Sequence, residues 1–296
     1  MKNNVKGSLC LMTTVLIWGS AFIAQSVGMD RIGPFTFQTF RSALAVIFLF
    51  PMAMLLDCRK CSLRQSMEKW TDPKLWKAGL ICGVALFCGS SLQQIALLYT
   101  DAGKAGFITA MYIVLVPILG CFIHRKPPKA AIFSVILAVI GLYLLSCVGV
   151  TEINKGDLLL MVCALGFAVQ ILCVDHFGGD LDGFRMNCIQ VLAVLVLSAL
   201  FMLATEAVNM ADVTASMGSI AYTGILSTGI AYSLQIQGQK EMDPTPAAII
   251  MSMESVVAVI CGALILKETM NGWEISGCVL MFAAVMLSQL PERKKA

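Results

Sequence analysis

Residues Ser233 to Glu268 read SLQIQGQKEMDPTPAAIIMSMESVVAVICGALILKE, and their core from Pro246 to Leu266 is long enough to cross a lipid bilayer. This core holds one charged residue, Glu254. A carboxylate near the middle of a membrane span costs about 2.5–3.5 kcal/mol on insertion scales, and ionisable groups at that depth commonly mark a functional site. Glu254 is therefore the first candidate functional residue.

The same stretch has a counterpart about 142 residues upstream, where residues 91–126 read SLQQIALLYTDAGKAGFITAMYIVLVPILGCFIHRK. In this register the Ser-Leu-Gln triplets coincide, Asp101 matches Asp243 and Gly120 matches Gly262. Self-similarity at a fixed shift indicates an internal duplication. Tyr112 is then the counterpart of Glu254, so the two copies differ where an ionisable group would sit.

The composition is that of an integral membrane protein. Of the 296 residues, 58% are hydrophobic and only 13% are charged, against about 25% charged residues in soluble domains. The net charge of +3 is small and lies in short loops, so we expect no nucleic-acid partner. The 12 cysteines are scattered through apolar segments as small hydrophobes. Cys58 and Cys61 form a C-x-x-C pair without a second pair or a nearby His, which is a weak zinc signal, and we expect no metal and no cofactor.

About ten apolar segments of spanning length follow one another, separated by charges, Gly and Pro. They are residues 7–27, 34–56, 75–98, 105–123, 128–146, 156–174, 184–204, 214–238, 245–266 and 272–290. The first segment has the charge pattern of a cleavable signal peptide. We expect it to be retained, because its removal would leave an odd number of spans and interrupt the duplication.

Basic residues set the orientation. With both termini in the cytoplasm, 16 Lys and Arg lie on the cytoplasmic side and 4 on the other. Segments 1–5 then form one repeat, 7–146, and segments 6–10 a second, 156–290. Because five is odd, the second repeat is inverted in the membrane relative to the first. Inverted repeats place a binding site near the midplane between the copies.

Several short motifs resemble those of a known family. They are Leu16-Ile17-Trp18-Gly19-Ser20-Ala21-Phe22, Arg41-Ser42-Ala43-Leu44, Lys104-Ala105-Gly106-Phe107 with Val116-Pro117, and Met253-Glu254-Ser255 with Lys267-Glu268. On these residues the whole chain resembles an EamA-type member of the drug/metabolite transporter superfamily. The resemblance implies ten helices around a central cavity and the transport of small organic solutes. One departure is Ser255, where the family often has Pro after the ninth-helix Glu.

The candidate substrate-binding residues are side chains expected to face the bundle interior. They are Glu254, Arg41, Trp18, Gln38, Gln93, Tyr112, Gln170, Tyr232 and Gln235, with Gln25 as a further amide. Each has a structural alternative. Glu254 could pair with a neighbouring helix. Arg41, about 10 Å into its span at 1.5 Å per residue, could bind substrate, pair with Glu254, lock helices together through an ion pair or extend to the outer interface. The amides could be interhelical hydrogen bonds, and the aromatic rings could be core packing.

The sequence thus predicts an all-α membrane protein that acts as a secondary transporter. We expect it to move a small organic metabolite or drug-like solute across the cytoplasmic membrane by alternating access, as an exporter, with protons as the candidate coupling ion. The lipid bilayer is the expected partner, and the sequence leaves open whether the protein forms a homo-oligomer. The alternative is a membrane-embedded scaffold or enzyme. A scaffold predicts no water-filled cavity that reaches Glu254, and an enzyme predicts a nucleophile–base pair or a metal cluster.

Overall fold

The computed structural model describes residues 4–57, 62–100, 102–123, 129–146, 154–265 and 271–289, and every regular element in these ranges is helical. The elements are α1 (Asn4–Gly28), α2 (Pro34–Asp57), α3 (Leu63–Glu68), η1 (Lys69–Thr71), α4 (Pro73–Ala96), α5 (Ala102–Thr109), α6 (Tyr112–Phe122), α7 (Lys129–Ser146), α8 (Lys155–Gly178), α9 (Gly183–Thr205), α10 (Met210–Ala215), α11 (Met217–Ala221), η2 (Tyr222–Ala231), α12 (Tyr232–Lys240), α13 (Pro244–Met251), α14 (Glu254–Ile265) and α15 (Gly272–Ser288). Asp101, Lys267, Glu268 and the Cys58–Cys61 pair lie outside the described residues.

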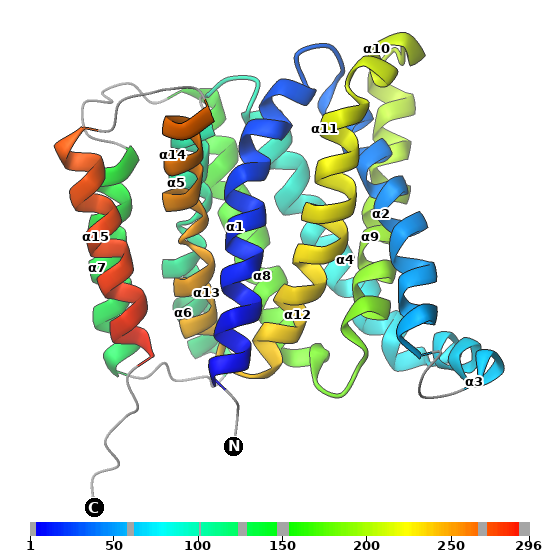
Figure 1. The fold of residues 1–296 in the computed structure, drawn as a ribbon, viewed down its shortest axis with the longest axis horizontal. Helices are drawn as coiled ribbons and strands as arrows, with labels where there is room; N and C mark the ends of the chain where they lie inside the picture. Colours follow the sequence, from blue (N-terminus) through cyan, green and yellow to red (C-terminus); the bar gives the residue numbers. More distant parts are fainter. Residues whose placement is uncertain are drawn as a thin grey trace, which may run out of the picture.

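Seven helical stretches in the described ranges are long and apolar enough to cross a membrane. They are Val5–Gly28, Pro34–Asp57, Pro73–Ala96, Gly103–Phe122, Lys155–Gly178, Gly183–Thr205 and Pro244–Cys261. Lys129–Leu145 and Gly272–Ser288 are shorter apolar helices. The helices stand side by side in one bundle (Figure 1).

The span predicted over 214–238 is helical almost throughout. α11, the π-helical η2 and α12 follow one another without a gap over residues 217–240, and one turn residue, Ser216, separates them from α10. A Cβ at Gly224 would lie 2.7 Å from the carbonyl oxygen of Arg41. The segment therefore approaches the backbone of α2 closely. π-Helical turns inside helices are rare and frequently occur at functional sites.

Polar caps and prolines begin the helices. Asp72 accepts a hydrogen bond from the amide of Lys74 ahead of Pro73, the first residue of α4. Asn154 and Asn271 form capping boxes at the starts of α8 and α15. These caps satisfy amide groups that a helix leaves unpaired at its start. The short breaks in the sequence are therefore true helix boundaries.

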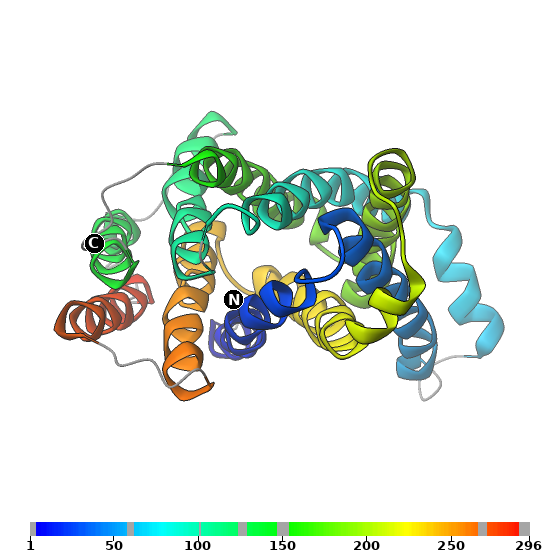
Figure 2. The ribbon, with the colours of Figure 1, turned by 90° about the horizontal axis from the view of Figure 1, so that it is seen from above.

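The helices α7 and α15 form a pair at one edge of the bundle, visible in both views (Figures 1 and 2). Their close approach depends on two glycines, because a Cβ on Gly277 would lie 2.6 Å from the carbonyl oxygen of Gly141. Small residues at such crossings let two membrane helices pack backbone to backbone.

The helices α2 and α9 run antiparallel, and a carboxylate closes the contact at each end. Asp57, at the end of α2, accepts a 2.6 Å bond from Nη2 of Arg185 near the start of α9. Glu206, just after α9, accepts bonds of 2.8 and 2.7 Å from the amides of Phe35 and Thr36 at the start of α2. Glu206 stands 149 residues after Asp57, and Arg185 stands 149 residues after Thr36. The two helices, offset by 149 residues in the sequence, thus run in opposite directions and are joined at both ends by a carboxylate.

Arg185 is one of the basic residues that the sequence assigns to the cytoplasmic side, and it is buried in the structure. Its side chain is only 1% exposed. Besides Asp57, it binds Ser66 of α3 and lies 5.5 Å from the ring centre of Trp70. Lys69 also reaches Asp57, at 2.8 Å. The elements α3 and η1, which follow α2, are therefore held against the start of α9 by a buried ionic cluster around Asp57 and Arg185.

The ends of several helices share one face. Ser8 in α1 donates to Gln289 after α15 over 3.4 Å, and Lys6 lies 3.9 Å from Glu241 after α12. Figure 1 shows α3 toward the same side of the bundle. The start of α1 and the ends of α12 and α15 therefore face the same side.

Asp57 and Glu206 differ in which partner groups are left without a counter-charge or an acceptor when the carboxylate is replaced by an amide. Asp57→Asn leaves Arg185 buried without its main counter-charge, and we expect a loss of about 3 kcal/mol in the free energy of unfolding. Glu206→Gln keeps an acceptor at the start of α2, and we expect a loss of about 1 kcal/mol. Unfolding by SDS titration in mixed micelles measures both values, with Glu68→Gln as the exposed control. Equal losses for all three variants would contradict this assignment.

Candidate functional site

Two of the spanning stretches are interrupted at matching positions. The first break separates α5 from α6 and the second separates α13 from α14, 142 residues later. Each closes with the same tight backbone bond. The amide of Met111 donates to Ile108 and the amide of Met253 donates to Ile250, both over 3.1 Å. The spans predicted over 105–123 and 245–266 are therefore present as Gly103–Phe122 and Pro244–Cys261, each with a two-residue turn inside it. Interrupted helices commonly build the central sites of transporters.

The two interrupted stretches pack against each other so that the first half of each contacts the second half of the other. α5 lies against α14, and α6 lies against α13. Ser255 strengthens one of these contacts, since its Oγ donates to the carbonyl oxygen of Gly106 over 3.1 Å. The Ser that replaces the Pro of the family pattern thus links the two halves.

Tyr112 and Glu254 meet at this crossing. Tyr112 is the first residue of α6 and Glu254 the first of α14, and both side chains are buried. The Tyr112 hydroxyl donates to Oε1 of Glu254 over 3.2 Å. Two residues at equivalent positions of the repeats are therefore direct partners, as expected for residues close to a pseudo-two-fold axis.

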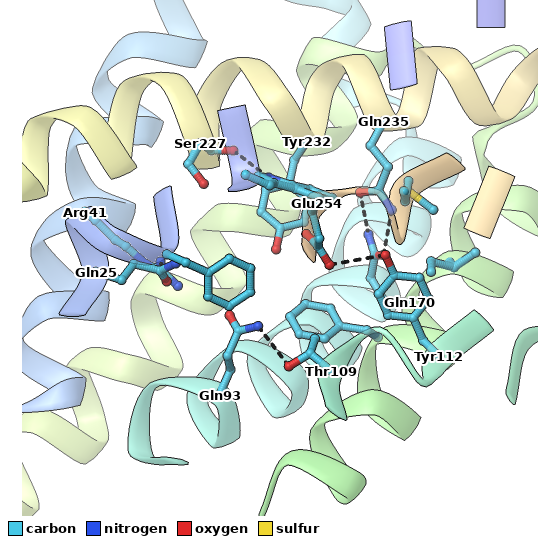
Figure 3. A pocket seen from close by; sticks show the side chains of 15 residues that line it. Gln25, Arg41, Gln93, Thr109, Tyr112, Gln170, Ser227, Tyr232, Gln235 and Glu254 are labelled. Carbon is cyan, nitrogen blue, oxygen red and sulfur yellow. Dashed lines mark hydrogen bonds between the residues drawn. The ribbon is translucent and has the colours of Figure 1, made fainter. Parts of the chain in front are cut away.

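A small cavity of about 40 Å³, lined by polar and aromatic side chains, surrounds this contact (Figure 3). Its lining residues are Trp18, Phe22, Gln25, Arg41, Gln93, Thr109, Tyr112, Phe167, Gln170, Ile171, Ser227, Tyr232, Gln235, Met251 and Glu254. Within the part of the chain that the structure describes, no three His, Cys, Asp or Glu residues gather closely enough to hold a metal ion.

Most of the candidate residues from the sequence line this cavity. They are Glu254, Arg41, Trp18, Gln93, Tyr112, Gln170, Tyr232 and Gln235, together with Gln25. Gln38 is the exception, because it lies behind Arg41 and is not among the lining residues. The lining residues that were not candidates from the sequence are Phe22, Thr109, Phe167, Ile171, Ser227 and Met251. Their residue types are common in membrane helices. Thr109 and Met251 each end a helix directly before one of the two breaks, but the sequence does not mark those breaks.

Arg41 points inward and is held by neutral groups. Its Nη1 donates to Oε1 of Gln25 over 2.7 Å, and its Nη2 donates to Oε1 of Gln38, which in turn donates to Ser90. The guanidinium lies 5.7 Å from the ring centre of Phe37. Arg41 is only 7% exposed, so it does not extend to the outer interface. An ion pair with Glu254, one of the alternatives for Arg41, is not formed.

The second repeat contains the same network without the charge. Gln170 donates to Gln190 over 3.1 Å, and Gln190 donates to Asn187 over 3.1 Å. Gln190 and Asn187 each stand 149 residues after Arg41 and Gln38, and Gln170 stands 145 residues after Gln25. Gln190 thus occupies the place of Arg41. The sequence analysis missed Asn187 and Gln190 because one fixed shift of 142 does not align these helices.

Aromatic residues form the part of the cavity wall between the hydrogen-bond networks of Arg41 and Gln190. The ring centres of Trp18 and Tyr232 are 4.8 Å apart. Trp18 also donates from its indole nitrogen to the carbonyl oxygen of Ser227 over 3.4 Å. Figure 3 shows Tyr232 and Ser227 on the same side of the cavity. The ring of Trp18 is therefore fixed in place and forms a rigid part of the cavity wall.

The model of the EamA-like transporter family matches the chain twice, over residues 5–147 and 154–290. The chain belongs to the EamA-like transporter family. With its apolar helices, this EamA-like chain is a multi-pass membrane protein.

Related proteins carry transporter names. An uncharacterized transporter of Archaeoglobus fulgidus is 30% identical over 95% of this chain and 85% of its own length. The uncharacterized transporter YoaV of Bacillus subtilis is 22% identical over 96% and 97%. The threonine/homoserine exporter RhtA of Salmonella typhimurium is 26% identical over 69% and 74%. A crystal structure with 17% identity superposes with a TM-score of 0.78 over 96% of both chains, which shows the common fold.

Gly19 of this EamA-like chain fixes how closely α1 approaches Glu254. A Cβ at Gly19 would lie 2.5 Å from Cβ of Val257 and 2.8 Å from the carbonyl oxygen of Glu254. We expect Gly19→Ala to push α14 away and to lower the free energy of unfolding by about 1–3 kcal/mol through overpacking. The matched control is Gly103→Ala, where nothing lies within 4 Å of the added carbon. SDS titration of both variants tests this, and equal stabilities would contradict the close approach.

Proposed function

We propose that the protein is a secondary transporter that exports a small organic solute across the cytoplasmic membrane by alternating access. The observation that carries the proposal is the buried contact between Tyr112 and Glu254, at matching helix breaks, inside a polar cavity. Transporters built from inverted repeats bind their substrates at such a place, between the copies and near the midplane.

The helix arrangement supports two inverted repeats of five spans each, 7–146 and 156–290. The pairs α2 with α9 and the crossed halves of the two broken stretches each bring equivalent segments together in opposite directions. In this proposal η2 and α12, together with α7 and α15, supply the spans that length and hydropathy leave out. The bundle then has ten spans around the cavity.

The lining of the cavity supports a small solute, because it places a few polar groups among apolar walls, as binding pockets for small molecules commonly do. Its volume of about 40 Å³ is smaller than that of a loaded pocket. In this proposal the cavity therefore widens when it opens to one side of the membrane. The exporter name of RhtA, which 69% of the chain matches, supports export of a metabolite.

Glu254 is the candidate for coupling transport to protons. It is the one carboxylic acid among the cavity-lining residues. Ionisable residues inside membrane bundles form the proton relays of pumps and transporters. In this proposal Glu254 changes its protonation as the cavity opens and closes. No step requires a nucleophile or a cofactor.

Glu254→Gln tests this role, because the amide keeps the shape and removes the ionisable group. We expect the variant to insert and fold normally, yet to lose at least nine-tenths of transport or to lose its pH dependence. Solute flux in proteoliposomes, with and without a pH gradient, is the measurement. Glu68→Gln on the exposed face of α3 is the matched control. Wild-type flux at every pH would make Glu254 a structural residue.

The orientation is tested by labelling from each side. In a cysteine-free background, Arg64→Cys and Gly272→Cys introduce single thiols at exposed positions toward opposite ends of the bundle. We expect a membrane-impermeant maleimide to label Gly272→Cys in intact cells and Arg64→Cys only after permeabilisation. The reverse pattern would invert the proposed topology, and labelling of both from one side would contradict the seven spans proposed between residues 64 and 272.

A further inference from the structure

The side of α4 that faces away from the bundle begins with two lysines and a tryptophan. Lys74, Trp76 and Lys77 are all exposed. The other side of α4 packs closely on α9, because a Cβ at Gly79 would lie 2.6 Å from the side chain of Ile189. Since α4 is long and apolar enough to cross a membrane, its first residues lie at the membrane boundary. Trp is enriched at this level, where lipid headgroups meet the acyl chains.

The ammonium groups of Lys74 and Lys77 have no opposite charge nearby. The two lysines are three residues apart and therefore share one side of the helix. Asp72 caps the helix by accepting from the amide of Lys74, and Glu68 lies 3.3 Å from Arg64. Among the described residues, no carboxylate lies within 4 Å of either ammonium group. Both charges can therefore bind an anion from outside the protein.

An apolar strip continues from these lysines along the same side of α4. Leu80, Ile81 and Val84 follow Lys77 at spacings of three, four and seven residues, and they are 44%, 38% and 52% exposed. In a membrane protein, apolar side chains exposed on a spanning helix face the lipid acyl chains. The start of α4 thus presents positive charge at the headgroup level and an apolar surface deeper in the membrane. This arrangement matches the two ends of an anionic phospholipid.

The short helix α3 extends this surface sideways. It lies outside the upright helices, next to the end of α2 (Figures 1 and 2). Ser66 on its inner side is buried, whereas Leu63 and Met67, one turn apart, are 68% and 45% exposed. Trp76 joins the start of α4 to this region, since its indole nitrogen donates to the carbonyl oxygen of Trp70 over 2.6 Å. Helices with one apolar and one polar face lie in the headgroup region of a membrane.

We propose that the corner formed by α3, η1 and the start of α4 binds an anionic phospholipid of the adjoining leaflet. Its phosphate lies between Lys74 and Lys77, and its acyl chains follow the apolar strip of α4. The ring of Trp76 then lies beside the glycerol of the lipid. The ligand is a phospholipid, not free phosphate, because the two charges continue directly into a surface that faces acyl chains. This site is on the outside of the bundle and is separate from the central cavity.

The second repeat shows that the fold does not require these residues. In the shift of 142 residues that aligns the two Ser-Leu-Gln triplets, Lys74 and Lys77 correspond to Ser216 and Ser219. Trp76 corresponds to Gly218. The second copy therefore forms its helix without a cation or an aromatic ring at these positions. Replacing both lysines with Gln removes the proposed phosphate contact and leaves the packed side of α4 unchanged.

The test uses the full-length protein in proteoliposomes, with Trp76 as the reporter. The chain has four tryptophans, so Trp18→Phe, Trp70→Phe and Trp273→Phe together leave Trp76 alone. Brominated phosphatidylglycerol or brominated phosphatidylcholine is mixed in increasing proportion with unbrominated phosphatidylcholine. Bromine quenches a tryptophan that it contacts, so the mole fraction at half-maximal quenching reports the relative affinity for each lipid.

We expect phosphatidylglycerol to reach half-maximal quenching at a mole fraction at least about fivefold lower than phosphatidylcholine, since one lysine near an anionic surface contributes about fivefold in affinity. Lys74→Gln with Lys77→Gln should reduce this preference to less than about twofold, by loss of the same lysine contribution. Lys74→Arg with Lys77→Arg should keep it, because the charge is retained. The matched control is Lys155→Gln, an exposed lysine at the start of α8, which should also keep it. The preference should fall at 1 M salt, where charges are screened beyond about 3 Å.

A second measurement leaves all four tryptophans in place. A lipid that binds the folded protein raises its unfolding temperature. Phosphatidylglycerol added in detergent should therefore raise the unfolding temperature more than phosphatidylcholine does, and the double Gln variant should lose this difference. The inference is overturned if both lipids quench or stabilise equally. It is also overturned if the double Gln variant keeps the preference, or if Lys155→Gln loses it to the same extent.

Discussion

The contact between Tyr112 and Glu254 depends on the interruption of both helices that carry these residues. Backbone that leaves the helix at membrane depth is tolerated only where it is buried in protein or lines a cavity. Both breaks satisfy this condition, because they face each other and close with short backbone bonds. The remaining bundle supports them: Gly19 lets α1 approach Glu254, and Ser255 joins α14 to α5. The cavity is thus a product of the crossing of two broken helices.

Charge is distributed over the bundle in two ways. At the ends of α2 and α9, each buried charge has a partner that balances it, as in the pair of Arg185 and Asp57. These contacts hold equivalent helices of the two repeats together. In the centre, Arg41 and Glu254 are surrounded by neutral donors and acceptors instead. The fold therefore separates charged groups that are balanced by an opposite charge from ionisable groups that are held by neutral partners.

The sequence was sufficient to predict a helical membrane protein with an internal duplication. Its apolar composition and the matching residues of the two copies can both be read from one sequence. It also placed Tyr112 opposite Glu254 in the repeat, and the structure brings the two into contact. The helix breaks were not predictable, since residues 110–111 and 252–253 include neither Gly nor Pro. Tertiary contacts produce these breaks. The hydrogen-bond network of Asn187 and Gln190 was not predicted. Loops of different length change the sequence offset between equivalent residues of the repeats from one helix to the next.

The two networks around Arg41 and Gln190 also bear on the energetics of the transport cycle. If the two halves of a bundle were identical, exchanging their conformations would give two states of equal free energy. Here one half carries a guanidinium and a phenol where the other carries an amide and a carboxyl group. In the proposed alternating-access cycle, the inward-open and outward-open states would then differ in how much water reaches each of these groups. The protein would favour one of the two states even without solute, and a solute gradient would act with or against that preference.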